Sequence, residues 1–252
     1  MSDFLTLLGA DRGIAEDELP LLYSYPDVAD GSWLRANFIT SLDGGATAAG
    51  LSGGLGGSGD RLIFSVLREL ADVVVVGAGT VRAEGYSGVR LDVGARQRRQ
   101  ARQQEEIPPL AVVTNSGHLD KDLGVFTRTE VPALVLTCTA TADDTRRRLA
   151  GLPAEVIDCS DGDPNSVDEA AILANLQARG LRRILTEGGP MLLGAFIDRG
   201  LLDELCLTIA PCIVGGSSRR IVTGPGQVMT QMRCAHLITD DAGYLYTRYV
   251  RG

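Results

Sequence analysis

The sequence predicts an α/β fold with a mainly parallel central sheet, flanked by helices and completed by an antiparallel C-terminal hairpin. Short apolar runs rich in β-branched residues alternate along the 252 residues with segments of helical spacing, the pattern of β-α-β units. Two of these runs lead into glycines: Gly77 follows one at once, and Gly188-Gly189 follows the other after Glu187. Residues 234–239 and 244–249 flank an Asp-Asp-Ala-Gly turn, which indicates the closing hairpin.

The elements are expected in the following order. Residues 1–30, punctuated by Pro20 and Pro26, predict an irregular N-terminal arm, and residues 31–252 predict a single domain without internal repeats. A glycine-rich loop at 44–59 separates a strand at 33–40 from an amphipathic helix at 58–70, in which apolar residues recur at helical spacing. Further strands are expected at 73–76, 110–114, 133–137, 183–186 and 204–209, and further helices at 141–149, 167–179 and 190–199.

Residues 90–106 form a charged, glutamine-rich excursion, RLDVGARQRRQARQQEE. It is either a basic contact surface or a solvated helical insertion, and we favour the insertion because a run of charges usually forms a solvated helix face.

Composition excludes several classes of function. The net charge of −8 argues against binding to nucleic acid or anionic membranes. Lys121 is the only lysine, which leaves almost no candidate for a Schiff base or a P-loop lysine, and two histidines cannot build a histidine-rich metal site. The five cysteines form no C-x-x-C pair and are expected to be buried structural thiols. Without a signal peptide or a long apolar segment, we expect a cytosolic protein.

Two strand–glycine–helix junctions are candidate phosphate sites. Gly77-Ala78-Gly79-Thr80-Val81 follows a buried strand, and free N–H groups at a helix start can hold a phosphate. Arg82 stands where a dinucleotide fingerprint has its third glycine, so a plain tight turn remains an equal alternative. Gly188-Gly189-Pro190 repeats the geometry with proline in the first helical turn. Two such junctions indicate a dinucleotide, and the alternative for the second is close helix–sheet packing.

Two carboxylates flank the glycine-rich loop. Asp60 opens the following helix, where it is either a cap or dipole partner, or a group that binds an amino-pyrimidine ring and helps to deliver a proton. Asp43 has a structural alternative as well, an Asx-type turn at the strand end.

Taken in order, these segments resemble a known family. Residues 38–44 (FITSLDG), Gly79-Thr80-Val81, Glu187-Gly188-Gly189-Pro190, and the later residues 202–204, 209–211 and 214–216 are similar to the pyrimidine reductase of riboflavin synthesis. That enzyme is the reductase half of a bifunctional deaminase–reductase, with a dihydrofolate reductase-like fold. The resemblance covers residues 33–249 and is strongest to the stand-alone actinobacterial form. The zinc-deaminase motifs H-x-E and P-C-x-x-C are missing, so we expect no deamination.

The resemblance implies a homodimer that uses NADPH to reduce a phosphoribosylamino-uracil, with hydride transfer to C1′ of the opened ribose imine. Cofactor contacts are then expected along both glycine junctions and after the strand at 110–114: from Gly77, Gly79, Thr80, Val81, Thr114, Asn115, Ser116, Gly188, Gly189, Pro190, Met191 and Leu192. The stretch 114–118 lacks an arginine to hold a 2′-phosphate.

Substrate contacts are expected from Asn37, Ser41, Asp43, Arg90 and Glu187, with Arg90 near the substrate phosphate and Asp60 as the catalytic acid. Asp60 occupies the position of the acidic pteridine-binding residue of dihydrofolate reductase, so a pterin reductase is the first alternative. A non-catalytic NADPH sensor, with residues 90–106 as its partner surface, is the second. No metal is expected.

Overall fold

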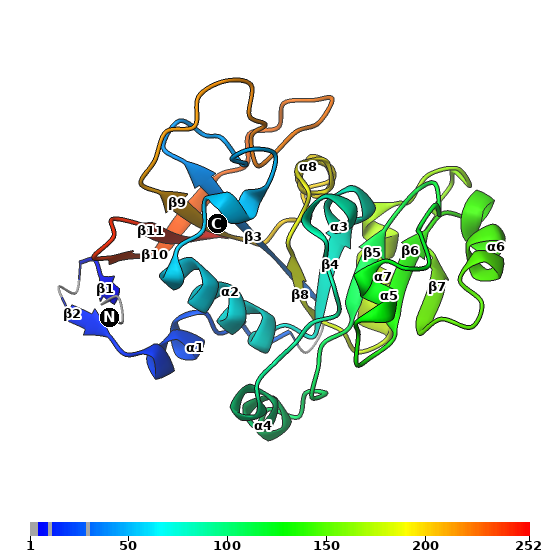
Figure 1. The fold of residues 1–252 in the computed structure, drawn as a ribbon, viewed down its shortest axis with the longest axis horizontal. Coiled ribbons are helices and arrows are strands. Elements are labelled where there is room, and N and C mark those ends of the chain that lie inside the picture. The colour runs from blue at the N-terminus through cyan, green and yellow to red at the C-terminus, as the bar shows by residue number, and fades with distance from the viewer. Residues whose placement is uncertain (1–4, 10–11, 29–30) are drawn as a thin grey trace.

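The computed structural model describes residues 5–9, 12–28 and 31–252, and one eleven-stranded sheet runs through them (Figure 1). In chain order the strands are β1 (Leu5–Leu7), β2 (Arg12–Ile14), β3 (Trp33–Ser41), β4 (Val73–Gly77), β5 (Leu110–Val113), β6 (Ala133–Thr137), β7 (Ala154–Asp158), β8 (Arg183–Thr186), β9 (Glu204–Ala210), β10 (Met232–Asp240) and β11 (Leu245–Arg251).

The sheet has a parallel part and an antiparallel part. The spatial order is β2-β1-β10-β11-β9-β3-β8-β4-β5-β6-β7. From β9 to β7 every neighbouring pair is parallel, while β11, β10, β1 and β2 add antiparallel pairs. In Figure 1 the antiparallel part lies on the left and β7 on the right. The predicted fold class, mainly parallel with a C-terminal antiparallel hairpin, is confirmed.

Helices cover both faces of the sheet. They are α1 (Leu19–Leu22), α2 (Ser58–Leu70), α3 (Ala78–Glu84), α4 (Val93–Ala101), α5 (Gly124–Thr127), α6 (Thr139–Arg148), α7 (Glu169–Ala178) and α8 (Pro190–Asp198), with 3-10 turns η1 (Glu16–Glu18) and η2 (Ser52–Gly54). One core cluster holds apolar side chains of α1, α2, α3 and α5, and a second holds those of α7 and α8. The valines of β4 alternate between the two clusters, which explains their unbroken apolar run.

Two expectations about the fold need correction, and one strand was not expected. Within the described part of residues 1–30, the arm is not irregular: β1 pairs with β10 and β2 with β1, which extends the sheet beyond the hairpin. The strand β7, whose residues only partly alternate between buried and exposed, was not predicted. The excursion at 90–106 does contain a helix, α4, but it is not simply solvated, because Arg99 is only 1% exposed.

Two further observations concern the cysteines and the length of the helices. Cys138, Cys159 and Cys206 are buried as expected, but Cys212 and Cys234 are exposed, and all five thiols are free. Within the described ranges, none of the helices combines the length and the apolar character needed to cross a bilayer.

Candidate functional site

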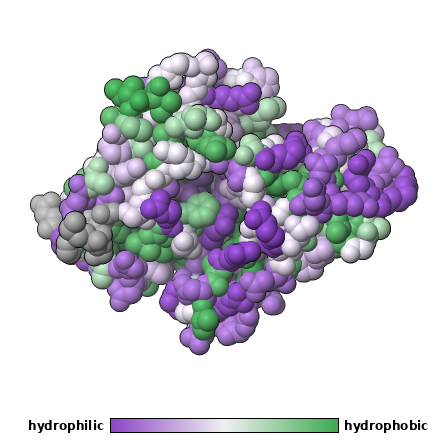
Figure 2. Space-filling view, viewed as in Figure 1, coloured by the Kyte–Doolittle hydropathy of each residue, from purple (hydrophilic) through white to green (hydrophobic). Residues whose placement is uncertain are grey.

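A cleft of about 1290 Å³ opens beside the carboxyl ends of β4 and β8. Its walls come from β3, α2, α3, the start of α8, the glycine-rich loop after β3 and residues 214–219. Figure 2 shows the surface hollowed below the upper lobe that these loops form, whereas hydrophilic side chains gather over α6 at the right. The carboxyl ends of parallel strands are where ligands bind in open α/β sheets, so this cleft is the candidate site.

One side of the cleft is built from backbone. Gly77 and Gly189 are the N-cap residues of α3 and α8, and neither helix start receives a side-chain cap hydrogen bond. The two starts are adjacent, because the Gly77 N–H donates to the Gly188 carbonyl at 2.7 Å. Gly79, Thr80, Pro190, Met191 and Leu192 also line the cleft. Both predicted junctions therefore meet at one place.

The two glycines of the second junction differ in what constrains them. Gly188 has φ +87°, and a Cβ there would lie 2.6 Å from the Phe38 ring, so close packing requires this glycine. Gly189, joined to it by a cis peptide bond, faces the cleft, and a Cβ there would lie 2.5 Å from the Thr80 hydroxyl. The packing alternative thus applies to Gly188, while Gly189 belongs to the cleft.

The residues expected at the adenosine end are only partly in the cleft. Asn115 lines it, although its side-chain oxygen already accepts from the Val167 N–H at 2.9 Å. Thr114 is buried, and its hydroxyl accepts from the Gly117 N–H. Ser116 does not line the cleft, and Val81 is buried in the core behind it.

The opposite side of the cleft is built from side chains on one face of α2. Asp60, Phe64 and Arg68 follow at four-residue spacing and all line the cleft. Burial raises the pKa of Asp60, against the effects of the Thr208 hydroxyl and Arg61, which lower it. Asp60 is not the cap of α2, since Gly57 is the N-cap and no side chain caps it. The cap alternative is therefore wrong, while Asp60 does lie in the first turn of α2, where the dipole-partner alternative placed it. Its raised pKa extends the pH range over which the protonated carboxyl is present.

Arg68 and Glu187 form a bidentate ion pair on the floor of the cleft. The Arg68 Nε and Nη2 donate to the two Glu187 oxygens at 2.7 Å each, and the Tyr86 hydroxyl donates to Glu187 Oε2 at 2.8 Å. Burial of Arg68 would lower its pKa, but Glu187 and Tyr86 outweigh this and raise it. The Arg68 guanidinium also lies 4.1 Å from the centre of the Phe64 ring. The predicted substrate residue Glu187 is thus already held by two internal partners.

Asn37 lines the cleft, but three other predicted substrate residues do not. Asp43 accepts from the Ser41 hydroxyl at 2.5 Å and from the Val214 and Gly215 N–H groups, so this pair braces the loop that borders the cleft. These hydrogen bonds lower the pKa of Asp43 to about 2. Arg90 lies in a separate depression beside Arg128.

Sequence reasoning missed several residues of the cleft. Arg68 and Phe64 had a readable signal, because they repeat the position of Asp60 on the same helix face. Tyr86 had none, since it lies in the irregular segment after α3. Ser218 and Arg219 also had none. The Ala46 N–H donates to the Arg219 carbonyl, and the Thr47 N–H donates to the Ser218 hydroxyl, which are tertiary contacts between two loops.

Comparison with known proteins places the chain among riboflavin-pathway reductases. Its sequence is 30% identical over 159 residues to the 2,5-diamino-6-ribosylamino-4(3H)-pyrimidinone 5′-phosphate reductase of Archaeoglobus fulgidus, covering 62% of this chain and 69% of that enzyme. It is 30% identical over 193 residues to the enzyme of the same name from Methanothermobacter thermautotrophicus, covering 75% of this chain and 83% of that enzyme.

A solved structure gives the same result for the fold. A pyrimidine reductase-like protein from Corynebacterium diphtheriae superposes with a TM-score of 0.80 at 27% identity, covering 95% of this chain and 99% of that one. Residues 32–246 match the model of the RibD C-terminal domain. The resemblance seen in the sequence is confirmed, and the chain belongs to the RibD C-terminal domain family.

Proposed function

We propose that this chain is an NADPH-dependent reductase that converts a phosphoribosylamino-pyrimidine to its ribityl form by hydride transfer to C1′ of the opened ribose imine. The observation that carries the proposal is one cleft with two uncapped helix starts on one side and the half-buried Asp60 carboxyl on the other. The names of the two archaeal relatives support this substrate class.

The backbone side of the cleft fits a dinucleotide. The N-cap glycines of α3 and α8 provide no side-chain cap, and helix starts favour phosphate through their free N–H groups and the helix dipole; at α8 these N–H groups begin at Met191, because Pro190 has none. Gly79 has open space where a Cβ would stand. Arg82, whose guanidinium reaches the His118 carbonyl at 3.4 Å, offers a cation beside the expected adenosine end and supports NADPH over NADH. Bound NADPH would supply the hydride.

The side-chain half of the cleft would supply the proton. Reduction of an imine adds a hydride to carbon and a proton to nitrogen, so a positioned acid is needed. Among the cleft carboxyls in the described ranges, Glu187 is held by Arg68 and Tyr86, Glu84 accepts from the Ser52 N–H, and Glu169 lies 3.6 Å from the Arg199 Nε. Asp60 has a raised pKa and is the acid that we assign to this step.

We also infer that the protein is a homodimer, joined through the outward face of β9. Leu205, Leu207 and Ile209 alternate with buried residues and stay partly exposed, and Ile213 beyond them is 75% exposed. A sheet face of this kind is typical of a subunit interface. Sedimentation of the wild type should give a dimer and Leu207→Glu a monomer, and a monomeric wild type at micromolar concentration would exclude this arrangement.

The activity is tested by following NADPH oxidation with a small panel of pyrimidine and pterin substrates. We expect turnover with the phosphoribosylamino-pyrimidine and little with dihydrofolate. Turnover with the pterin alone would replace the proposed substrate. Tight NADPH binding without hydride transfer to any of them would indicate the sensor alternative.

A further inference from the structure

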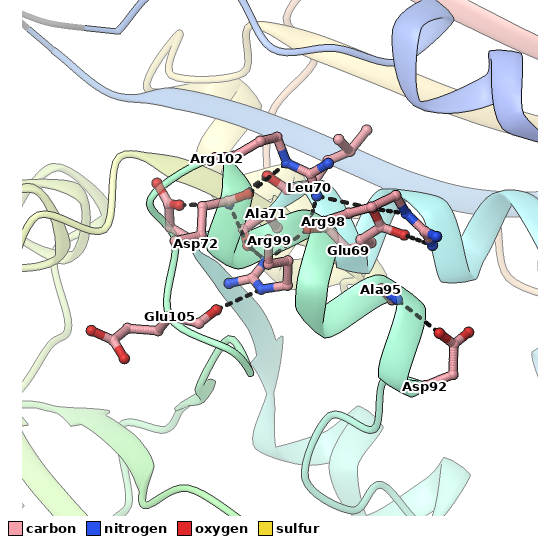
Figure 3. Close-up of polar contacts among 11 residues, drawn as sticks. Glu69, Leu70, Ala71, Asp72, Asp92, Ala95, Arg98, Arg99, Arg102 and Glu105 are labelled. Carbon is pink, nitrogen blue, oxygen red and sulfur yellow. Dashed lines mark hydrogen bonds and ion pairs between the residues drawn. The ribbon is translucent and has the colours of Figure 1, made fainter.

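The charged excursion at 90–106 folds back onto the C-terminal end of α2 (Figures 1 and 3). Its helix α4 begins at a side-chain cap, where Asp92 accepts from the Ala95 N–H at 2.7 Å. Four side chains from this excursion then contact α2 and the residues after it: Arg98, Arg99, Arg102 and Gln104. We call these four residues the α2 clamp.

The end of α2 needs such partners. The last carbonyls of a helix have no intrahelical donor, and a glycine turn is one common way of satisfying them. Here β4 begins at Val73, two residues after the C-cap Ala71, which leaves no room for that turn. Arg99 Nη1 instead donates to the Glu69 and Ala71 carbonyls at 2.8 and 2.5 Å, while its Nε donates to the Glu105 carbonyl.

Gln104 extends the clamp from α2 to β8. Its amide donates to the Leu70 carbonyl at 3.1 Å and to Asp72 Oδ1 at 2.9 Å. The other oxygen of Asp72 accepts from the backbone N–H groups of Arg182 and Arg183, where β8 begins. One chain of hydrogen bonds thus joins the end of α2 to the start of β8.

Arg98 and Arg102 hold the Glu69 side chain. The Arg98 Nε and Nη2 donate to its two oxygens at 3.0 and 2.7 Å, and Arg102 Nη2 donates at 2.9 Å. Glu69 is 3% exposed and directly follows Arg68, so the rotation of α2 about its axis is fixed next to the arginine that faces the cleft.

The two elements joined in this way carry the two partners of the ion pair on the cleft floor. Arg68 lies in the last turn of α2, and Glu187 follows the last residue of β8. We propose that Arg99 and Gln104 are positioning residues, which set the register of α2 against β8 and thereby the geometry of the Arg68–Glu187 pair for substrate binding. This inference rests on the proposed function, and it gives the excursion an internal task in place of the partner surface considered from sequence.

A positioning role and a purely stabilising role predict different effects on the two halves of the cleft. Within the described part of the chain, the hydrogen bonds of the clamp reach neither α3 nor α8, whose starts form the backbone side, so NADPH affinity should be spared. General destabilisation would instead weaken the binding of both ligands, and its effect would add to the effects of other substitutions.

The first experiment compares Arg99→Met with Arg96→Met on the same helix. Arg96 is a matched control because, among the described residues, its side chain bonds the Leu91 carbonyl and the exposed Glu130 and lies 3.9 Å from Glu106. In the folded Arg99→Met protein we expect substrate KM to rise about 10-fold to 100-fold and NADPH Kd to change less than about twofold. Arg96→Met should change neither. Equal changes in KM and NADPH Kd, or an unchanged KM, would overturn the proposal.

Gln104→Met provides a second variant of similar size if Arg99→Met does not fold, and the same pattern is expected at smaller amplitude. A cycle with Glu187→Gln then tests the route of the effect. If the clamp acts through the ion pair, adding Arg99→Met or Gln104→Met to Glu187→Gln should raise KM little further, whereas multiplied effects would contradict it.

The same cycle measured by urea unfolding does not depend on turnover. The double variant should have a urea midpoint close to that of the less stable single variant. If the two losses in midpoint simply add, the clamp and the ion pair are not coupled. If no pyrimidine were reduced, the proposed function would fail while this cycle would still decide whether the clamp and the ion pair are coupled.

Discussion

The two sides of the cleft are built from different parts of the chain. The side formed by α3 and α8 presents backbone N–H groups at glycine N-caps, while the side formed by α2 presents Asp60, Phe64 and Arg68. Backbone donors bind phosphate whatever the neighbouring side chains are, provided that nothing blocks the approach. Side-chain chemistry needs a particular group at a particular place. The two sides should therefore respond differently to substitution.

The largest effect is expected from Asp60→Asn. If Asp60 donates the proton, kcat should fall by about 10² to 10⁴ while NADPH affinity is kept. The pKa of this carboxyl is raised by burial, so the acid form is lost as the pH rises through it, and wild-type kcat should fall toward alkaline pH. Steady-state kinetics over a range of pH will show whether kcat of the variant lacks this fall toward alkaline pH. A raised KM with normal kcat would make Asp60 a binding group only.

On the backbone side, Gly189→Val should weaken NADPH binding by about 1–3 kcal/mol, as expected when a few charge-assisted hydrogen bonds are lost. The added side chain would start 2.5 Å from the Thr80 hydroxyl, inside the cleft. Met191→Ala is the control, because Met191 lines the same side, its residue is 73% exposed, and shortening its side chain leaves the backbone N–H groups in place. Calorimetric titration should give a near-normal Kd for the control. If folded Gly189→Val binds NADPH with unchanged affinity, the cofactor phosphate does not bind at this junction.

A smaller effect on the side-chain half is expected from Glu187→Gln. The amide can still accept from Tyr86, but the Arg68 charge loses its bidentate partner. We expect substrate KM to rise about tenfold, in line with the loss of one charged hydrogen-bonded contact, with NADPH Kd unchanged. The reverse pattern, a changed NADPH Kd with a normal KM, would break the division of the cleft into two halves.

The smallest effect concerns a region outside the cleft and sets a baseline for pH. Burial lowers the pKa of His236 from 6.5 to about 4, helped by Arg248 and Arg35 and opposed by Glu204, while the Tyr23 ring packs edge-on against the imidazole. The folded state then binds fewer protons than the unfolded chain between these values. The contribution of His236 to the free energy of unfolding should be constant well above pH 6.5. It should fall by about 1 kcal/mol as the pH is lowered from about 7.5 to about 5.5.

Urea unfolding at the two pH values, on wild type and His236→Gln, measures this contribution. The variant should lose that part of the pH dependence, and an identical slope in both proteins would show that His236 does not titrate differently on folding. NADPH Kd should be the same in both, since His236 does not line the cleft.

Local pattern accounts for much of the fold. The helix predicted at 58–70 and the strand predicted at 183–186 have the bounds that α2 and β8 show, because the apolar pattern that defines each lies within one contiguous segment. The glycine junctions could also be predicted, because a site built from backbone groups favours glycines, which have no side chain. Strands β1, β2 and β7 were not, because short edge strands are specified by the neighbour with which they pair.

By itself, the sequence determined the fold class, the family and the two phosphate-site candidates, all of which depend on contiguous residues. Tertiary structure decided which side chains share the cleft: it brought Tyr86 to Glu187 across 101 positions, and left Arg90 in a separate depression. It also gave the charged excursion a buried arginine, Arg99, that bonds the carbonyls of Glu69 and of the C-cap Ala71, 30 and 28 residues away. The physical reason is that contacts between polar groups distant in sequence are fixed by the packing of elements, which leaves no local period in the sequence.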